Sequence, residues 1–283
     1  MKSKSQLTGY LFISPWIIGF ILFTAFPILY SLYLSFHDVK ITTGGIETVF
    51  VKFQNFEYAF AVDGQFTDSL LQYFRELVIS VPIIIVFSLI ISILLNQKVK
   101  FRGVFRTIFF LPVIIASGPV MKELIDQGVT TIPTIETYAI YDMVSSNPGG
   151  FFNGILLYLM DNMIMILWFS GVQILIFLAA LQKIDHQIYE AAKIDGASNW
   201  EIFWKVTLPS LFPMIVVNLI YTIVTISVFS LNPVIGHIQK NMFKVETGFG
   251  YASALSWIYF IAISVILAIS VVLISFRGKR KYG

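Results

Sequence analysis

The sequence predicts an all-α integral membrane protein with six spanning helices. Of its 283 residues, 57% are hydrophobic and only 12% are charged, whereas a soluble domain carries about 25% charged residues. The charged residues are also confined to a few stretches. Six of the runs between them that contain no Asp, Glu, Lys or Arg predict spanning helices, and five of these six reach the ~20 apolar residues that a spanning helix needs.

The six predicted spans cover residues 11–36, 77–97, 105–125, 160–182, 207–232 and 249–276. The third reaches spanning length only if its helix continues past Lys122 and Glu123. None of the runs reaches the ~40 residues that two spans require, so a seventh helix is not predicted. We therefore expect a single transmembrane domain over residues 1–283, with long outer segments at 37–76 and 126–162.

The Lys and Arg residues predict the orientation of the chain. With the N-terminus inside, 13 of the 19 basic residues fall in cytoplasmic segments and 6 fall on the other side. Because cytoplasmic loops carry an excess of Lys and Arg, both termini are expected in the cytoplasm. The net charge of +3 then reflects topology, and no nucleic-acid partner is predicted. The absence of cysteine excludes disulfides, thiol catalysis and zinc–thiolate sites.

The inner loop at 183–208 has the pattern of a short helix, a turn and a second helix. Ile188, Ala191, Ala192 and Asp195 fit one face of the first helix. Gly196 then ends it, because glycine permits the left-handed conformation that terminates helices. The sequence Ser198-Asn-Trp-Glu201 is a capping box, which predicts the start of the second helix. We predict a docking surface for a cytoplasmic protein; the alternative is an ordinary amphipathic connector.

This loop resembles the EAA loop of permease subunits in binding-protein-dependent ABC importers. That signature reads Glu-Ala-Ala, two residues, Asp-Gly-Ala, then a Phe, a Leu-Pro and a further Pro. The matching residues here are Glu190, Ala191, Ala192, Asp195, Gly196, Ala197, Phe203, Leu208, Pro209 and Pro213. The stretches at 10–16, 26–27, 102–112, 167–171 and 178–182 resemble the maltose-type carbohydrate permeases. Two departures are Ile184-Asp185, where Ile-Pro is usual, and Asn232-Pro233, where a glycine-rich turn is usual.

The resemblance implies the six-helix type I importer permease fold, called MetI-like, in a bacterial or archaeal cytoplasmic membrane. It implies that the loop fits a groove on an ATPase subunit and couples its closure to the helices. The ATPase-coupling residues would be Glu190, Ala191, Ala192, Asp195, Gly196, Ala197, Phe203 and Pro209. The expected partners are a second, related permease, two ATPase subunits and an extracytoplasmic solute-binding protein, with a sugar or oligosaccharide as substrate.

The chain itself is expected to be a transport subunit and not an enzyme. It contains no Walker A sequence, HExxH, G-x-S-x-G or paired-carboxylate motif. The ATP and Mg²⁺ would be bound by the partner ATPase, and no cofactor or metal is expected in this chain.

Polar and aromatic side chains recur along the fifth predicted span at helical spacing. They are Asn218, Tyr221, Thr225, Phe229 and Asn232. Polar groups that face lipid are costly, so this face should point inward, where it offers a sugar both hydroxyl partners and aromatic rings. The same residue types also hold helices together, and both interpretations stay open.

Three further residues are candidates for the solute pathway. Ser230 is included because, with Phe229 and Asn232, it stands where related permeases place solute contacts. Trp168 and Gln173 on the fourth span are the others, although Trp in a membrane helix is most often an interfacial anchor.

Two competing functions remain on the sequence alone. A permease of the same class could carry a non-sugar polar solute, because the residues do not name the cargo. A secondary transporter usually places Asp, Glu or His near the membrane centre. Here the 16 acidic residues and 3 histidines fall in predicted loops or near helix ends, which argues against proton coupling.

Overall fold

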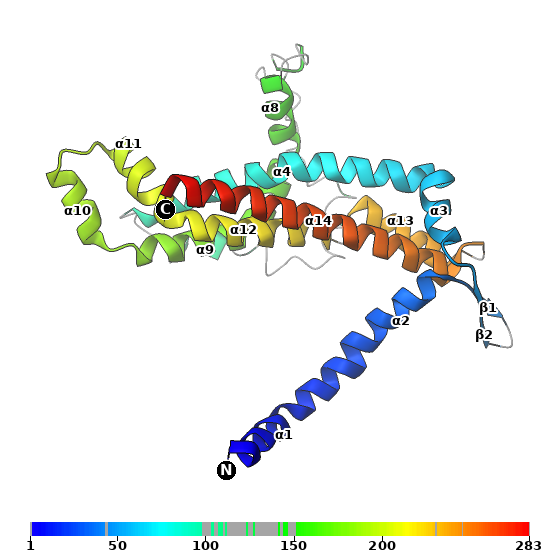
Figure 1. The fold of residues 1–283 in the computed structure, drawn as a ribbon. Helices are drawn as coiled ribbons and strands as arrows, with labels where there is room; N and C mark the ends of the chain where they lie inside the picture. Colours follow the sequence, from blue (N-terminus) through cyan, green and yellow to red (C-terminus); the bar gives the residue numbers. More distant parts are fainter. Residues whose placement is uncertain are drawn as a thin grey trace. The chain divides into compact units, whose positions relative to one another are not determined.

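The computed structural model describes residues 2–42, 45–97, 151–229, 231–244 and 246–282, together with 103–104, 107–109, 111, 123, 127, 141 and 144–146. Figure 1 shows the order of the elements along the chain. The chain divides into two compact units. The first comprises Met1–Leu71 and Pro233–Ile263, and the second comprises Gln72–Asn232 and Ser264–Gly283.

Five helical segments in the described part are long and apolar enough to cross a membrane. They are Tyr10–Ser35, Gly64–Asn96, Met165–Lys183, Asn199–Ser227 and Gly248–Ile274. Each corresponds to one of the predicted spans. The third predicted span, 105–125, lies mostly outside the described residues, as does most of the outer segment at 126–162.

In the first unit, the N-terminal span consists of α1 (Lys2–Phe20), a π-helical turn η1 (Ile21–Ala25) and α2 (Phe26–Ser35). Large apolar side chains along this run are exposed, as expected for residues that face lipid or a neighbouring subunit. The strands β1 (His37–Thr42) and β2 (Gly45–Phe50) follow as an antiparallel hairpin that pairs His37 with Phe50 at its open end. Helix α3 (Gln54–Ala61) comes next.

The outer segment expected at 37–76 is therefore largely regular structure. Helix α4 (Gly64–Asn96) begins well before the predicted span at 77–97. Its start is set by Asp63, whose Oδ1 accepts a hydrogen bond from the backbone N–H of Phe66 at 3.0 Å. A side-chain oxygen that satisfies a free N–H of the first turn stabilises a helix start. Polar residues such as Asp68 and Arg75 extend this helix beyond its apolar part.

Helix α13 (Pro233–Met242) and the part of α14 (Gly248–Tyr282) up to Ile263 complete the first unit and meet the chain near Asp63. Asp63 Oδ2 accepts hydrogen bonds from His237 Nε2 at 2.7 Å and from Tyr251 Oη at 2.7 Å. The side chains of His237 and Asp63 are only 5% and 11% exposed. We call Asp63, His237 and Tyr251 the outer junction.

The electrostatics of the outer junction favour an ionised Asp63. Burial raises the pKa of Asp63, but the hydrogen bonds from Tyr251, His237 and the Phe66 amide, with the attraction of His237, outweigh it. The pKa of Asp63 is therefore held below its ordinary value. Hydrogen bonds to a carboxylate stabilise its charged form. In the outer junction all of these donors to Asp63 come from the protein itself.

The second unit contains α8 (Phe151–Asp161), α9 (Met163–Lys183), α10 (His186–Ile194), α11 (Asn199–Ile202), a π-helical turn η3 (Phe203–Thr207) and α12 (Leu208–Ser227). Helices α9 and α12 pack along each other, and α10 and α11 lie in the connection between them (Figure 1). Buried apolar side chains such as Ile174, Phe177 and Ile223 belong to these two helices. Helix α12 ends at Ser227, before the predicted end at 232.

Candidate functional site

The connection between α9 and α12 forms the helix–turn–helix that the sequence predicts at 183–208. Helix α9 ends at Lys183, and Ile184 and Asp185 are extended. The Asp185 side chain caps α10 by accepting a hydrogen bond from the Gln187 N–H at 3.0 Å. Asp185 thus gives α10 a capped start. We call residues 183–208 the coupling segment, after the role that the resemblance predicts for them.

Gly196 makes the turn of the coupling segment. Its φ is +80°, in the left-handed region that favours glycine. The Ala197 N–H donates to the Ala192 carbonyl at 3.0 Å, and the Gly196 N–H donates to the Lys193 carbonyl at 3.1 Å. These bonds satisfy carbonyls at the end of α10 that would otherwise lack partners. The prediction that Gly196 ends the first helix is confirmed.

Ser198 and Glu201 form the predicted capping box at the start of α11. The Ser198 Oγ accepts a hydrogen bond from the Glu201 N–H at 3.3 Å, and Glu201 Oε2 accepts one from the Ser198 N–H at 3.0 Å. Lys205 Nζ donates to Glu201 Oε1 at 3.2 Å. The Tyr189 and Thr207 hydroxyls lie 3.2 Å apart and join α10 to η3. The coupling segment is therefore held in shape by its own hydrogen bonds.

The coupling segment exposes apolar as well as charged side chains. Ile194 is 86% exposed and Trp200 is 70% exposed. Glu190 is exposed and lies 3.1 Å from His186 Nδ1. Of the other predicted coupling residues, Ala191, Asp195 and Gly196 are exposed, and Ala192, Ala197, Phe203 and Pro209 are half-buried. Exposed large apolar groups on a rigid frame are typical of an interaction surface.

Two of the predicted pathway residues meet in a polar seam between α9 and α12. Gln173 Nε2 donates to Thr222 Oγ1 at 2.9 Å, and Asn218 Nδ2 lies 3.4 Å from the Gln173 carbonyl oxygen. Gln173 and Asn218 are both fully buried. Their side-chain oxygens, Gln173 Oε1 and Asn218 Oδ1, have no hydrogen-bond partner in the described part of the chain. In this arrangement both residues join the two helices.

The remaining candidates of the fifth span do not form one helical stripe. Helix α12 ends at Ser227, so Phe229 and Asn232 lie in the turn that leads to α13, where the Asn232 N–H donates to the Phe229 carbonyl at 3.0 Å. Tyr221 is exposed, Thr225 is half-buried and Asn232 is buried. The Phe229 ring packs edge-on against Phe169 with 5.1 Å between centroids. Trp168 is half-buried on α9, and Ser230 lies outside the described residues.

Sequence reasoning missed several polar contacts that hold the second unit together. The Tyr73 and Ser227 hydroxyls lie 2.5 Å apart, and both side chains are buried. Ser88 on α4 is also buried and donates to the Ser170 carbonyl at 3.5 Å. Hydroxyl groups within otherwise apolar runs were the available signal, but their partners lie on other helices and cannot be identified from spacing.

The groups in these two sites are suited to recognition. Among the described residues, no three His, Asp or Glu side chains form a group that could hold a metal ion. The coupling segment offers a shaped surface, and the seam offers amide and hydroxyl groups within an apolar helix pair.

Comparison with known proteins gives a consistent result. Residues 59–278 match the family described as binding-protein-dependent transport system inner membrane component. The chain is 30% identical to the probable ABC transporter permease protein YesP of Bacillus subtilis, over 94% of this chain and 90% of that protein. It is also 30% identical to the lactose transport system permease protein LacF of Rhizobium radiobacter, over 94% of this chain and 93% of that protein.

Among solved structures, the fold is similar to a chain of a bacterial alginate ABC transporter in complex with a periplasmic protein bound to alginate pentasaccharide. The TM-score is 0.64 at 20% sequence identity, and the match covers 98% of this chain and 96% of that chain.

Proposed function

The chain belongs to the family of binding-protein-dependent transport system inner membrane components, and we propose that it forms part of the pathway by which an ATP-driven importer carries a sugar or oligosaccharide into the cytoplasm. The sugar class is supported by the names of relatives, which include permeases for lactose, arabinooligosaccharides and alpha-glucosides. The apolar helices support a multi-pass membrane location.

The coupling segment is the observation that carries this proposal. A turn at Gly196, a capping box at Ser198 and exposed Ile194 and Trp200 give it a fixed shape and an apolar surface. Such a surface suits a groove on an ATPase subunit. When that groove closes, the movement would pass through η3 into α12, because these elements are continuous in the chain. The helices would then switch between outward and inward access.

We propose the following assembly. Two ATPase subunits, which bind ATP and Mg²⁺, meet the coupling segments of this chain and of a related second permease. A solute-binding protein docks on the outer side, which in this orientation carries the hairpin β1–β2. The excess of Lys and Arg in the inner segments supports cytoplasmic termini and a location in a bacterial or archaeal cytoplasmic membrane.

The solute pathway is proposed along α9, α12 and the turn that follows α12. The candidate residues are Trp168, Gln173, Asn218, Tyr221, Thr225, Phe229, Ser230 and Asn232. Phe229 and Asn232 lie together at the end of α12, where an aromatic ring and an amide could contact a sugar. Gln173 and Asn218 are buried in the seam and would reach the pathway only after α9 and α12 move apart.

The test is uptake into proteoliposomes that contain this chain with the permease, ATPase and binding protein that purify with it. We expect ATP-dependent uptake of at least one of lactose, maltose and arabinotriose. Asn232→Ala should change the relative uptake of these sugars while ATP hydrolysis in the absence of sugar stays constant. Uptake driven by a proton or sodium gradient without ATP would contradict the proposal, as would uptake of none of the sugars.

A further inference from the structure

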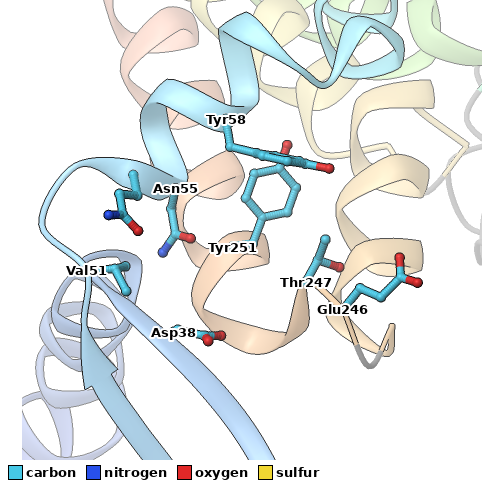
Figure 2. Close-up of a pocket in the computed structure, with 8 residues that line it drawn as sticks. Asp38, Val51, Asn55, Tyr58, Glu246, Thr247 and Tyr251 are labelled. Carbon is cyan, nitrogen blue, oxygen red and sulfur yellow. The ribbon is translucent and has the colours of Figure 1, made fainter.

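The first unit contains a pocket of about 250 Å³ between the hairpin, α3 and the start of α14. Figure 2 shows Asp38 from β1, Asn55 and Tyr58 from α3, and Tyr251 from α14 around one opening. Glu246 and Thr247 close its opposite side (Figure 2). Pockets for drug-sized ligands begin at about 300 Å³, so this one suits a single small ring or side chain.

Several groups that line the pocket are fixed by hydrogen bonds to residues outside it. The Tyr251 hydroxyl donates to Asp63 in the outer junction, and Thr247 Oγ1 donates to the Asn241 carbonyl at 2.9 Å. Asn55 Nδ2 donates to the carbonyls of Ser35 at 2.9 Å and His37 at 3.1 Å. Both amide protons of Asn55 are thereby used, and its Oδ1 remains as an acceptor. Fixed side chains of this kind are what a preorganised binding site requires.

The pocket also offers aromatic surface. The rings of Tyr58 and Tyr251 meet edge-on, with centroids 5.2 Å apart and planes at 90°. Tyr58 is 44% exposed, so part of its ring is free to contact a ligand. Aromatic rings bury apolar faces of a ligand while neighbouring polar groups fix its orientation.

The charges around the pocket select among ligands. Among the described residues that line it, two are carboxylates and none is Lys, Arg or His. Asp38 is already paired with Lys40, with 3.2 Å between Oδ2 and Nζ. Glu246 has neither an ion pair nor a hydrogen bond with any described residue. A phosphate or a uronic acid would be repelled here, whereas hydroxyl groups can donate to the free carboxylate and to Asn55 Oδ1.

We propose that this pocket binds one neutral sugar residue of the transported molecule on the outer side of the membrane. The inference rests on the proposed function and adds a subsite away from α9 and α12. A basic side chain of a partner protein is the other occupant that carboxylates suggest. The lining favours a sugar, because Lys40 already offsets the charge of Asp38, and Glu246 is the one carboxylate of the described lining without an ion pair, among amide, hydroxyl and aromatic groups.

The experiment measures binding to the complete importer in lipid nanodiscs without its binding protein. The probes are lactose, maltose and arabinotriose, with a galacturonic acid trimer as the acidic probe and N-acetylarginine amide as the cationic one. We expect at least one neutral sugar to bind and the acidic trimer not to bind. Glu246→Gln and Tyr58→Ala should each weaken sugar binding about tenfold, as expected when a charge-assisted hydrogen bond or an aromatic contact is removed.

The matched control is Glu57→Gln, which removes the same charge from an exposed residue of α3 that does not line the pocket. It should leave sugar binding unchanged. If Glu246→Gln and Tyr58→Ala bind and import sugar as the unaltered importer does, the subsite is wrong and the proposed function stands. Binding of arginine amide that is lost in Glu246→Gln, without sugar binding, would identify a docking pocket for protein. If the unaltered importer carries no sugar, both proposals fail.

Discussion

The coupling segment and the outer junction are built in opposite ways. The coupling segment is exposed, and most of its hydrogen bonds join residues within one or two helical turns, as between Ser198 and Glu201. The outer junction is buried, and its bonds from His237 and Tyr251 to Asp63 join residues 174 and 188 positions apart. Substitutions in the coupling segment should therefore change communication with a partner, whereas substitutions in the outer junction should change the stability of the first unit.

The largest effect is expected for Asp63→Ala. The change leaves His237 and Tyr251 without their acceptor and removes the cap of α4. Hydrogen bonds to a charged group are worth about 1.5–3 kcal/mol each, so hydrogen exchange of the α3 and α13 amides should accelerate strongly. Asp68→Ala, which removes an exposed carboxylate one turn further along α4, is the control. Equal protection in both variants would show that the junction does not hold the first unit together.

The same carboxylate predicts a pH dependence. The pKa of Asp63 is lower in the folded protein than in the unfolded chain, so the stabilisation is fully present above the unfolded value of about 4. It is lost as pH falls through the folded pKa, because the unfolded chain then binds the proton more readily. Protection of α3 should decline in acid in the unaltered protein. In Asp63→Asn this part of the decline should be absent.

The next largest difference is expected between two alanine substitutions of glycine. A Cβ on Gly250 would lie 1.9 Å from the His37 carbonyl oxygen, so α14 and β1 could not approach each other as they do. Gly250→Ala should destabilise the first unit by about 3 kcal/mol. A Cβ on Gly196 meets nothing within 4 Å, and the cost comes only from its φ of +80°, about 1–2 kcal/mol.

The two glycine variants also separate function from stability. Gly196→Ala should lower uptake per ATP hydrolysed while hydrogen exchange in α3 is unchanged. Gly250→Ala should accelerate hydrogen exchange in α3 while uptake per ATP hydrolysed is unchanged. Gly236→Ala in α13 is the control, because its Cβ would meet nothing within 4 Å. Alanine is the better helix former, so this variant should be neutral or slightly stabilised. If Gly250→Ala behaves like Gly236→Ala, the close approach of α14 to β1 is not needed for the stability of the first unit.

These differences explain which parts of the molecule could be predicted from sequence. Apolar runs set the spans, and caps such as Asp185 and Ser198 act on neighbouring backbone, so a local pattern is enough to find them. The outer junction escaped prediction because Asp63 and His237 are adjacent only in space. The stripe on the fifth span was extended too far because α12 ends at Ser227, where the apolar composition gives no stop signal before Pro233.

A smaller effect is expected for Ser198→Ala in the coupling segment. The substitution removes the cap of α11, which is worth about 1 kcal/mol. Exchange of the amides in α11 and η3 should accelerate, and ATPase activity should couple less tightly to uptake, while the outer junction is unaffected. Ser198→Thr retains the hydroxyl and should behave like the unaltered protein. A loss of protection in α3 would mean that the two regions are not independent.

The smallest effect is expected for Gln173→Leu in the seam between α9 and α12. The variant removes the hydrogen bond to Thr222, but it also removes a buried oxygen that has no partner among the described residues. Hydrogen bonds between membrane helices average about 0.6 kcal/mol, so the two contributions should nearly cancel in thermal unfolding. Thr222→Ala should be more destabilising, because it leaves the Gln173 amide buried without its acceptor. A large loss of stability in Gln173→Leu would show that a buried polar contact can be strongly stabilising even without a charge such as that of Asp63.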